Sequence, residues 1–538
     1  MIKARPPYQL LALTLASGFL YFLSIPPFAL VWPAWFVWLP LLWGARRATS
    51  GQAFLLGWLA GSLGSLGGLW FMVGVISTHS TIPVPLAVIL TALMAMQQGM
   101  GVGLWLGLAR RLHDRVPTWL LYPTLYVAVE SFYPTVFSLH LGDCQSGCLW
   151  TRQCFDLTGP GGLTFVIVGF HVALWRVLEG YAREAVVGVA MLMASLIYGW
   201  VRVGQVERQM AQAGQPLRVA MIQNDIGTPK TAEQMIEGLH RLQKMAAAVA
   251  SSSQPDLIVF PETAVRTPPP MHRVEGESLM RVASVRRYPI ALTYLAPDFA
   301  YSPQSGFRVP LLFGAMSEDE THDGPIAGRT ARYNAAFLLD GQGNVLGRAL
   351  KNKLLLGGEY IPGAAYFPWL YTKVLTRASL LSAGTKPAVL PLAGKNLGIS
   401  ICYEDTMPAQ SYQLARQNPQ LLVNLTNDAW FGKSSEPAAH LAVSAARCIE
   451  LRLYMVRSTA TGISAFIDPL GRIVSQSQPD GPQTLLGDVA WMPGGTVFSR
   501  LGLSFSWLCG ILSALWLVQA RRSASRSFEL MPTVKKSI

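Results

Sequence analysis

Residues 396–405 read Asn-Leu-Gly-Ile-Ser-Ile-Cys-Tyr-Glu-Asp, and this stretch decides the fold of the second half of the chain. Its apolar residues predict a buried β-strand that stops at a thiol and two carboxylates. The run at 231–250 has the apolar spacing of an amphipathic helix. Similar short strand-like runs rich in Val, Ile and Leu occur at 217–222, 256–260, 309–315 and 421–425. Because strands and helices alternate, the block predicts an α/β layered fold.

Two hairpins and one boundary are expected around this block. Asp340-Gly341-Gln342-Gly343 and Asp468-Pro469-Leu470-Gly471 each separate two strand-like runs, and Asp, Pro and Gly are the residues that tight turns favour. The polar run 205–216 ends in Gly-Gln-Pro and predicts a linker. The α/β domain is therefore expected to span 217–490.

The rest of the chain has the composition of a membrane protein. Only 14% of its 538 residues are Asp, Glu, Lys or Arg and 51% are hydrophobic, whereas soluble domains carry about 25% charged residues. A membrane helix needs about 20 mostly apolar residues, because only a helix satisfies its own backbone groups in hydrocarbon. Eight runs meet this requirement: 8–24, 27–44, 53–76, 83–108, 118–137, 162–178, 185–201 and 501–519. We therefore expect a membrane domain over 1–204 with seven helices, and a final membrane helix within 491–520.

The basic residues predict the orientation of these helices. Fourteen of them lie in short loops or termini on one side: Lys3, Arg5, Arg46, Arg47, Arg110, Arg111, Arg115, Arg176, Arg183, Arg521, Arg522, Arg526, Lys535 and Lys536. The opposite short loops contain only Arg152. Since Lys and Arg are retained on the cytoplasmic side, both termini, including the basic tail 521–538, are expected in the cytoplasm and the α/β domain outside it. The net charge of +13 is then a topology signal, which argues against nucleic acid as a partner.

Three residues at the ends of strand-like runs could together perform acyl transfer. Glu262 offers a base, Lys351 an ammonium that stabilises an oxyanion, and Cys402 a nucleophile. Each residue also has an ordinary interpretation. Glu262 could be a carboxylate beside a helix N-terminus, Lys351 a solvated strand lysine, and Cys402 a buried apolar cysteine. Lys353 is a rival for Lys351, because residues two apart on a strand face the same way. The spacing alone does not bring these residues together.

Four motifs in order resemble the nitrilase superfamily, and with the predicted helices the chain resembles its membrane-embedded, lipoprotein-acylating branch. They are Pro261-Glu262-Thr263, Lys351 eight residues before the glutamate of Gly358-Glu359-Tyr360-Ile361-Pro362, Cys402-Tyr403-Glu404-Asp405, and Asn427-Asp428-Ala429-Trp430-Phe431-Gly432. The resemblance implies a multi-pass α-helical membrane domain plus a nitrilase-like α-β-β-α sandwich. It also implies the bacterial inner membrane, with the sandwich on the periplasmic side, and no cofactor or metal.

The resemblance assigns the chemistry to Glu262 as general base, Lys351 as oxyanion stabiliser and Cys402 as nucleophile. It implies that an acyl chain passes from a membrane phospholipid, through a thioester on Cys402, to the N-terminal amine of a diacylglyceryl-modified lipoprotein. Two alternatives remain open. One is a membrane-tethered amidase with the same triad, and the other is a non-catalytic lipid- or lipoprotein-binding assembly protein.

The same resemblance implies a set of supporting residues. Glu359 is the second glutamate, the backbone N–H of Tyr403 helps to hold the oxyanion, and Glu404 adjoins the nucleophile. Trp430 and Phe431 are candidate contacts for an acyl chain, although an aromatic pair is also common in a core.

Several further residues have two interpretations each. Cys144, Cys148 and Cys154 share an outer loop, where an oxidising compartment could permit a disulfide. Glu130, in a predicted membrane helix, is either functional or part of a helix-to-helix hydrogen bond. The remaining candidates are expected to be structural: His440, Cys448 and Cys509.

Overall fold

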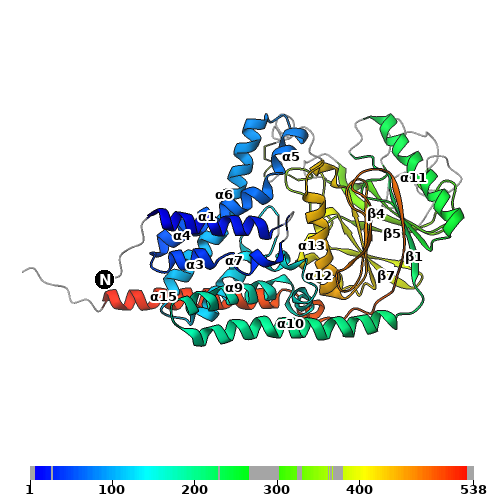
Figure 1. Ribbon diagram of the computed structural model, residues 1–538. Helices are drawn as coiled ribbons and strands as arrows, with labels where there is room; N and C mark the ends of the chain where they lie inside the picture. The colour runs from blue at the N-terminus through cyan, green and yellow to red at the C-terminus, as the bar shows by residue number, and fades with distance from the viewer. Residues whose placement is uncertain are drawn as a thin grey trace, which may run out of the picture.

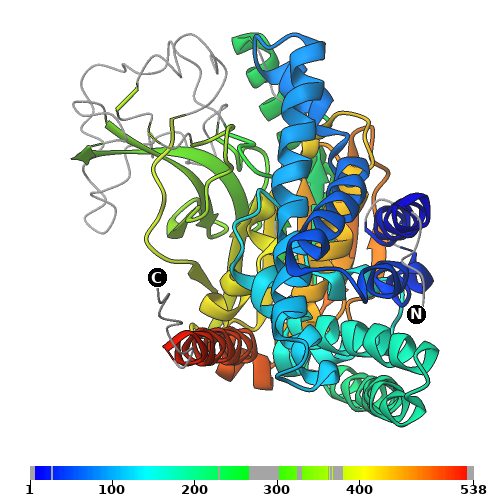
Figure 2. The same cartoon turned by 90° about the vertical axis from the view of Figure 1, so that its left-hand side faces the viewer.

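The computed structural model describes residues 7–25, 28, 30–137, 139–227, 231–265, 302–323, 330–360, 363, 366, 367 and 380–529. A helical region built mainly from the N-terminal residues lies beside a unit made of two β-sheets, as Figure 1 shows. Viewed from the helical end in Figure 2, the helices stand in front of the sheets. Ile361 and Pro362 of the third motif lie outside the described residues, as do Lys3, Arg5, Lys535 and Lys536.

The helical region consists of long apolar helices joined by short turns. Its helices are α1 (Pro7–Ser24), α2 (Val31–Ala34), α3 (Leu39–Ala45), α4 (Ser50–Leu69), α5 (Met72–His79), α6 (Val84–Leu112), α7 (Thr118–Phe132), η1 (Leu141–Gln145), η2 (Thr151–Cys154), α8 (Phe155–Thr158), α9 (Pro160–Leu178), α10 (Ala182–Ala211) and, from the C-terminal end, α15 (Ser504–Glu529). Glycines allow α4 and α6 to touch backbone to backbone. A Cβ added at Gly61 would lie 2.8 Å from the carbonyl oxygen of Gly99, which is the close packing that small residues permit in membrane helices.

Three of these helices, α6, α9 and α10, are long and apolar enough to cross a membrane by length and composition. The pair α4 and α5 passes the same test together but is bent by 56°, as in a broken span or a re-entrant loop. Shorter apolar helices occupy 8–24 and 31–45. The chain is therefore a membrane protein with three or four candidate spans, and the expected total of seven plus one stays a prediction.

The expected linker is shorter than its polar sequence indicates. Helix α10 continues to Ala211, and in Figure 1 it runs from the helical region along the sandwich. Polar residues hold this extension in place, because Glu207 accepts a hydrogen bond from Arg472 at 2.8 Å and Arg202 pairs with Asp156 at 2.7 Å. Val206 is fully buried. Residues 205–211 are thus helical, since tertiary contacts extend the helix through residues that suit either state, and the division of the chain at 205–216 stays a prediction.

The second half of the chain forms two six-stranded sheets. The first has the order β12-β1-β2-β3-β4-β5 and the second the order β11-β10-β9-β8-β7-β6. The strands are β1 (Leu217–Gln223), β2 (Leu257–Val259), β3 (Leu311–Asp323), β4 (Thr330–Leu339), β5 (Val345–Leu350), β6 (Ala388–Leu392), β7 (Lys395–Ile401), β8 (Leu421–Thr426), β9 (Met455–Thr459), β10 (Ala465–Ile467), β11 (Ile473–Gln476) and β12 (Gln483–Val489). Both predicted hairpins are confirmed, since β4 pairs with β5 and β10 with β11 in antiparallel fashion.

The two sheets pack face to face and helices cover their outer faces. Val219 and Val259 of the first sheet share one core with Ile399 and Val423 of the second. Helix α11 (Ala232–Ser253) covers the first sheet, while α12 (Pro408–Ala415) and α13 (Glu436–Leu451) cover the second. The expected α-β-β-α sandwich is therefore confirmed.

Helix α13 and the residue after it also join the sandwich to the helical region. Ile449 of α13 packs into the core of the membrane helices. Arg452 caps the helix and is buried, where it donates to Asp156 at 2.8 Å and to Gln153 at 2.6 Å. Breaking such a buried pair is costly, so this contact holds the sandwich in one position against the membrane helices.

Candidate active site

Cys402 lies at the point where β7 ends in the middle of the second sheet. It begins the short 3-10 helix η6 (Cys402–Thr406) and has a φ of +55°, a conformation that costs a non-glycine residue about 1–3 kcal/mol. Hydrogen bonds maintain this turn: Asn424 Nδ2 donates to the carbonyl oxygen of Cys402 at 2.9 Å, and the Ile401 N–H donates to Glu404 Oε2 at 2.8 Å. The turn points a buried thiol out of the strand end.

Three charged residues from different segments form one group, which we call the Lys351 cluster: Glu262, Lys351 and Glu359. Lys351 Nζ lies 3.3 Å from Glu262 Oε1, and 2.9 Å and 2.8 Å from the two carboxylate oxygens of Glu359. All three side chains are buried. The first sheet thus brings together Glu262 and Lys351, which the sequence separates by 89 positions.

Lys351, and not Lys353, belongs to the site. β5 ends at Leu350, so Lys351 directly follows the strand, at its end as expected, and the strand argument for a shared face with Lys353 does not apply. The Lys351 N–H donates to the carbonyl oxygen of Asn334 at 2.9 Å, which carries the side chain inward. Lys351 is 1% exposed, whereas Lys353 is exposed.

Glu262 follows β2 in a turn that lies against β3. A Cβ at Gly314 would be 2.7 Å from Glu262 Cα, so only glycine permits this approach. Asn334 on β4 donates one amide to both carboxylates, at 2.6 Å to Glu262 Oε1 and at 3.0 Å to Glu359 Oε1. Among the described residues, Glu262 Oε2 has no hydrogen-bond partner, which leaves it available as a base.

Burial and the neighbouring charges shift the pKa values of both Glu262 and Cys402. Burial raises the pKa of Glu262, the Lys351 ammonium opposes this rise, and Glu359 adds to it. Burial also raises the pKa of the Cys402 thiol well above its usual range, with Glu262 adding to the rise and Lys351 opposing it. Glu262, Lys351 and Glu359 thus all act on the pKa of the Cys402 thiol, and Lys351 Nζ lies 5.9 Å from the centroid of the ring of Tyr403, the residue next to Cys402.

Tyr403 and Glu404 support the loop that follows Lys351. Glu404 Oε1 accepts hydrogen bonds from the N–H groups of Asn352 at 2.7 Å and Lys353 at 2.9 Å. Burial raises the pKa of Glu404 to about 7. The Tyr403 hydroxyl donates to the Leu354 carbonyl at 2.8 Å. These bonds tie the nucleophile's turn to the lysine's loop.

A second buried group of charges adjoins Cys402, and we call it the Arg457 cluster: Asp405, Asp428, His440 and Arg457. Arg457 pairs with Asp405 at 2.6 Å and Asp428 at 3.2 Å, while the two ring nitrogens of His440 contact the same carboxylates at 2.8 Å and 3.1 Å. The two carboxylates raise the pKa of His440 to about 10 against the opposing effect of burial. The expectation that His440 is structural agrees with these contacts.

The Arg457 cluster does not fit a metal ion. Ligand atoms of Asp428, Glu436 and His440 lie within 4.8 Å of one another. Arg457 already neutralises Asp428, however, and both nitrogens of His440 are engaged. A metal ligand must be a neutral imidazole with a free lone pair, and a held imidazolium offers none.

An apolar cavity of about 910 Å³, counting its open mouth, connects Cys402 with the membrane helices. Its wall on the sandwich side includes Tyr403, Trp430 and Phe431, and its wall on the membrane side is formed by α1, α4, α5 and α6: Tyr21, Ile25, Ser65, Gly68, Leu69, Phe71 and Gln98. The short helix α5 and the residue before it contact the sandwich. The ring of Phe71 lies edge-on to that of Phe431 with centroids 5.6 Å apart, and the ring centroids of His79 and Trp430 are 4.5 Å apart. The candidate acyl contacts therefore line the same cavity as the nucleophile.

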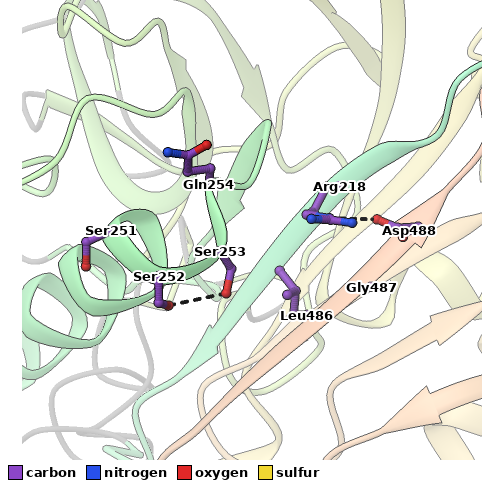
Figure 3. Close-up of a pocket in the computed structure, with 8 residues that line it drawn as sticks. All are labelled: Arg218, Ser251, Ser252, Ser253, Gln254, Leu486, Gly487 and Asp488. Atoms are coloured by element: carbon purple, nitrogen blue, oxygen red, sulfur yellow. Dashed lines mark hydrogen bonds and ion pairs between the residues drawn. The ribbon is translucent and has the colours of Figure 1, made fainter.

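Another pocket and several candidate residues lie away from this site. Figure 3 shows a shallow polar depression at the edge of the first sheet, between Arg218 and the end of α11, where the Arg218–Asp488 pair and small polar side chains gather. All six cysteines are free thiols. Glu130 accepts hydrogen bonds from the Leu141 N–H at 2.6 Å and from Thr164 of α9 at 2.9 Å, which corresponds to the helix-to-helix alternative.

Comparison with known proteins defines the class and then the branch. The family model for carbon-nitrogen hydrolase matches residues 218–491, just over half of the chain. The chain therefore belongs to the carbon-nitrogen hydrolase family, the nitrilase superfamily. The model for the apolipoprotein N-acyltransferase N-terminal domain matches residues 17–173, and within the superfamily this match places the chain in the apolipoprotein N-acyltransferase branch.

Individual relatives agree with this placement. Apolipoprotein N-acyltransferase from Geobacter metallireducens is 29% identical over 512 residues, which cover 92% of each chain. The one from Azotobacter vinelandii is 29% identical over 548 residues, which cover 97% of each chain. Among solved structures, Saccharomyces cerevisiae Nit3 matches with a TM-score of 0.36 and 17% identity, over 52% of this chain and 91% of that chain.

Reasoning from the sequence missed three groups at the site. Asn334 directly precedes the apolar run 335–339 of β4, which is a weak signal that could have been used. Arg457 has a clearer signal, because it is a charged residue within the buried strand β9. Glu436 carries no such signal, since a glutamate that begins a helix is ordinarily a surface residue.

Proposed function

We propose that this chain transfers a fatty acyl chain from a membrane phospholipid to the N-terminal amine of a diacylglyceryl-modified lipoprotein, through a thioester on Cys402. One observation carries the proposal: the thiol of the Glu–Lys–Cys site opens into an apolar cavity walled by membrane helices. An acyl chain needs such an apolar surface, and a soluble amide does not.

The first half of the reaction forms the thioester. Glu262 takes the proton of Cys402, and the thiolate attacks the ester carbonyl of the phospholipid. Lys351 and the backbone N–H of Tyr403 stabilise the oxyanion. When the tetrahedral intermediate collapses, the lysophospholipid oxygen leaves and takes the proton from Glu262.

The second half transfers the acyl group to the acceptor. The amine attacks the thioester carbonyl, and the same groups stabilise the second oxyanion. Glu262 takes the proton of the attacking nitrogen and returns it to the Cys402 thiolate as the amide forms. The site is then ready for another phospholipid, and no other reactant is consumed.

The test is the mass of the enzyme after incubation with phospholipid and no acceptor. Wild type should gain one acyl chain that neutral hydroxylamine removes, while Cys402→Ala and Cys402→Ser should gain none. Cys448→Ala, which changes another buried thiol, should be acylated normally. An acyl group that survives in Cys402→Ala would overturn the assignment.

The competing amidase reading predicts a different result. Such an enzyme would release an acid or amide and would form no triacylated product from a diacylated lipopeptide. The same site serves both reactions, and the membrane-lined cavity favours the lipid reaction.

The proposal includes the orientation in the bacterial inner membrane, with the sandwich in the periplasm and both termini in the cytoplasm. It rests on the asymmetry of basic residues in the short loops. A reporter that is active only outside the cytoplasm should work when fused near Gly214 and fail when fused after Arg522. Activity at the second position would reverse the orientation.

A further inference from the structure

One carboxylate in the cavity has no part in the thioester chemistry. Glu436 is the first residue of α13 and lines the cavity together with Cys402 and Tyr403. Of the described residues that form the wall, it is the one acidic side chain. Its position places a second acid in the chamber where the acyl-enzyme would wait for an acceptor.

Glu436 is not committed to the neighbouring ion cluster. Its Oε2 is buried and has no hydrogen-bond partner. Asp428 and His440 lie within 4.8 Å of it, but their own bonds go to Arg457 and to each other. A buried oxygen without a partner destabilises the fold, so its retention points to a ligand that supplies the missing donor.

We propose that Glu436 binds a primary ammonium group of a substrate and holds it beside Cys402. This inference rests on the proposed function, which brings such a group into the cavity as the N-terminal ammonium of the lipoprotein. An ammonium offers three N–H donors and a positive charge, which complement an unpaired carboxylate oxygen. His440 also lines the cavity, but its charge is balanced by Asp405 and Asp428 within the Arg457 cluster. The walls contributed by α1, α4 and α6 present no competing charge among the lining residues described.

The same carboxylate can prepare the amine for attack. Burial and Asp428 raise the pKa of Glu436 to about 8, against the opposing effects of His440 and Arg457, which is close to the usual value of an α-amino group, about 7.7–8.0. At neutral pH the carboxyl group is therefore protonated before the substrate arrives, and it loses its proton to water when the ammonium binds beside it. An ammonium is not a nucleophile, so it then gives one proton to the Glu436 carboxylate and becomes a neutral amine. The second proton leaves during attack and goes to Glu262 as described above, while the first stays on Glu436 and restores its protonated form.

The titratable groups around Glu436 set the conditions for this transfer. Tyr21 of α1, Cys402 and Tyr403 of η6 and His440 of α13 share the cavity wall with Glu436, and Asp405, Asp428 of η7 (Asp428–Phe431), His440 and Arg457 act on it through their charges. The Arg457 cluster is internally paired, and Tyr403 and Cys402 carry protons at neutral pH, since the pKa of Tyr403 is raised to about 12 and that of Cys402 well above its usual range. Glu436 is therefore the group of this set that can exchange a proton with an amine.

Two substrates could supply a primary ammonium, and the experiment separates them. The donor would supply it as a phosphatidylethanolamine headgroup, and the acceptor as the N-terminus of a diacylated lipopeptide. Thioester formation on full-length Glu436→Gln is measured with phosphatidylethanolamine and with phosphatidylglycerol, which lacks the ammonium. Discharge of the thioester is then measured with the lipopeptide and with neutral hydroxylamine.

The expected defect is confined to the step that uses the charged acceptor. Glu436→Gln should form the thioester from both lipids at the wild-type rate and react with hydroxylamine normally. Its KM for the lipopeptide should rise about 10-fold to 100-fold, the usual range for losing one charge-assisted hydrogen bond. Glu436→Asp, which keeps the charge, should retain part of the affinity, and Glu207→Gln on the outer surface of α10 should behave as wild type.

Other outcomes are equally decisive. A defect confined to thioester formation from phosphatidylethanolamine would assign the ammonium to the donor and support the same role for Glu436. Equal defects with both lipids and with hydroxylamine, or no defect in any assay, would overturn the proposal while leaving the acyl-transfer function standing. If wild type forms no thioester at all, the proposed function fails first and this inference falls with it.

Discussion

The Lys351 cluster and the Arg457 cluster flank the same cysteine, are equally buried, and differ in charge balance. The Lys351 cluster has two carboxyl groups for one ammonium. The Arg457 cluster has two carboxylates for one guanidinium and one imidazole, and the raised pKa of His440, about 10, keeps that imidazole charged at neutral pH. The first cluster is therefore one positive charge short, and the second is neutral.

This difference separates a reactive group of charges from a structural one. A cluster with an excess carboxylate can accept the proton of Cys402 and pass it on without leaving an unpaired charge behind. A cluster whose charges cancel is not stabilised by moving a proton, and its ion pairs instead fix the positions of its side chains. Asn424 connects the two, because its amide donates to the Cys402 carbonyl and its oxygen accepts from Arg457 at 3.0 Å.

The strongest test of the comparison removes the single cation of the Lys351 cluster. Lys351→Met should lower the rate of thioester formation by about 10³-fold, because it deletes an oxyanion donor. The fold should survive, because Glu262 and Glu359 can take up protons when the ammonium is gone. Lys353→Met, two residues away and exposed, is the matched control and should keep full activity. The measurement is acyl-enzyme mass in single turnover together with thermal unfolding.

Removing the guanidinium of the other cluster should have the opposite profile. Arg457→Met leaves two buried aspartates facing one imidazolium, so the free energy of unfolding should fall by about 3–5 kcal/mol. The molecules that remain folded should still form the thioester. Arg218→Met, which breaks an exposed pair with Asp488, should cost at most about 1 kcal/mol. Loss of chemistry in a fully stable Arg457→Met protein would show that the Arg457 cluster is reactive after all.

A milder change tests how the Lys351 cluster orients its cation. In Glu359→Gln the remaining side-chain oxygen still accepts a hydrogen bond from either Lys351 Nζ or the Leu355 N–H. The new NH₂ group then faces the other of these two donors. The rate of thioester formation should fall about 10-fold to 100-fold without being abolished. Glu237→Gln on the exposed face of α11 is the control. Wild-type kinetics in Glu359→Gln would remove this residue from the site.

Much of the catalytic half could be predicted from local sequence. Strands such as β8 are buried on both faces and so appear as continuous apolar runs, and the turns at 340–343 and 468–471 carry turn residues. The positions of Glu262, Lys351 and Cys402 could be predicted only through the resemblance to a known family. Their proximity depends on the order of the strands, which local patterns do not contain.

The parts that could not be predicted depend on contacts between distant segments. The 56° bend between α4 and α5 leaves Gly68 and Phe71 on the wall of the cavity, although the sequence 53–76 reads as one continuous apolar run. Helix α10 extends through a polar sequence because Arg472, in the turn before β11, donates a hydrogen bond to Glu207. Asn334 and Glu436 acquire their roles from neighbours that lie 72 and 34 residues away, Glu262 and Cys402.

The most gradual expected effect is a dependence of stability on pH that follows from the raised pKa of His440 in the Arg457 cluster. The pKa of His440 is raised from 6.5 to about 10 in the folded protein, so between these values the folded state binds more protons than the unfolded state. The stability that His440 contributes is fully present below pH 6.5 and is lost as the pH rises through about 10.

A comparison of wild type with His440→Gln isolates this contribution from all other titrations. The difference in their free energies of unfolding should be largest near pH 6 and should shrink toward pH 10 by at most about 1.4 kcal/mol per pH unit. The rate of thioester formation should instead change at acidic pH. Because the pKa of Glu262 is raised above its usual value, the rate should already fall at mildly acidic pH, where an ordinary carboxylate would still act as a base. If the difference between wild type and His440→Gln is constant from pH 6 to pH 10, His440 is neutral, the Arg457 cluster carries a negative charge, and charge balance does not distinguish the two clusters.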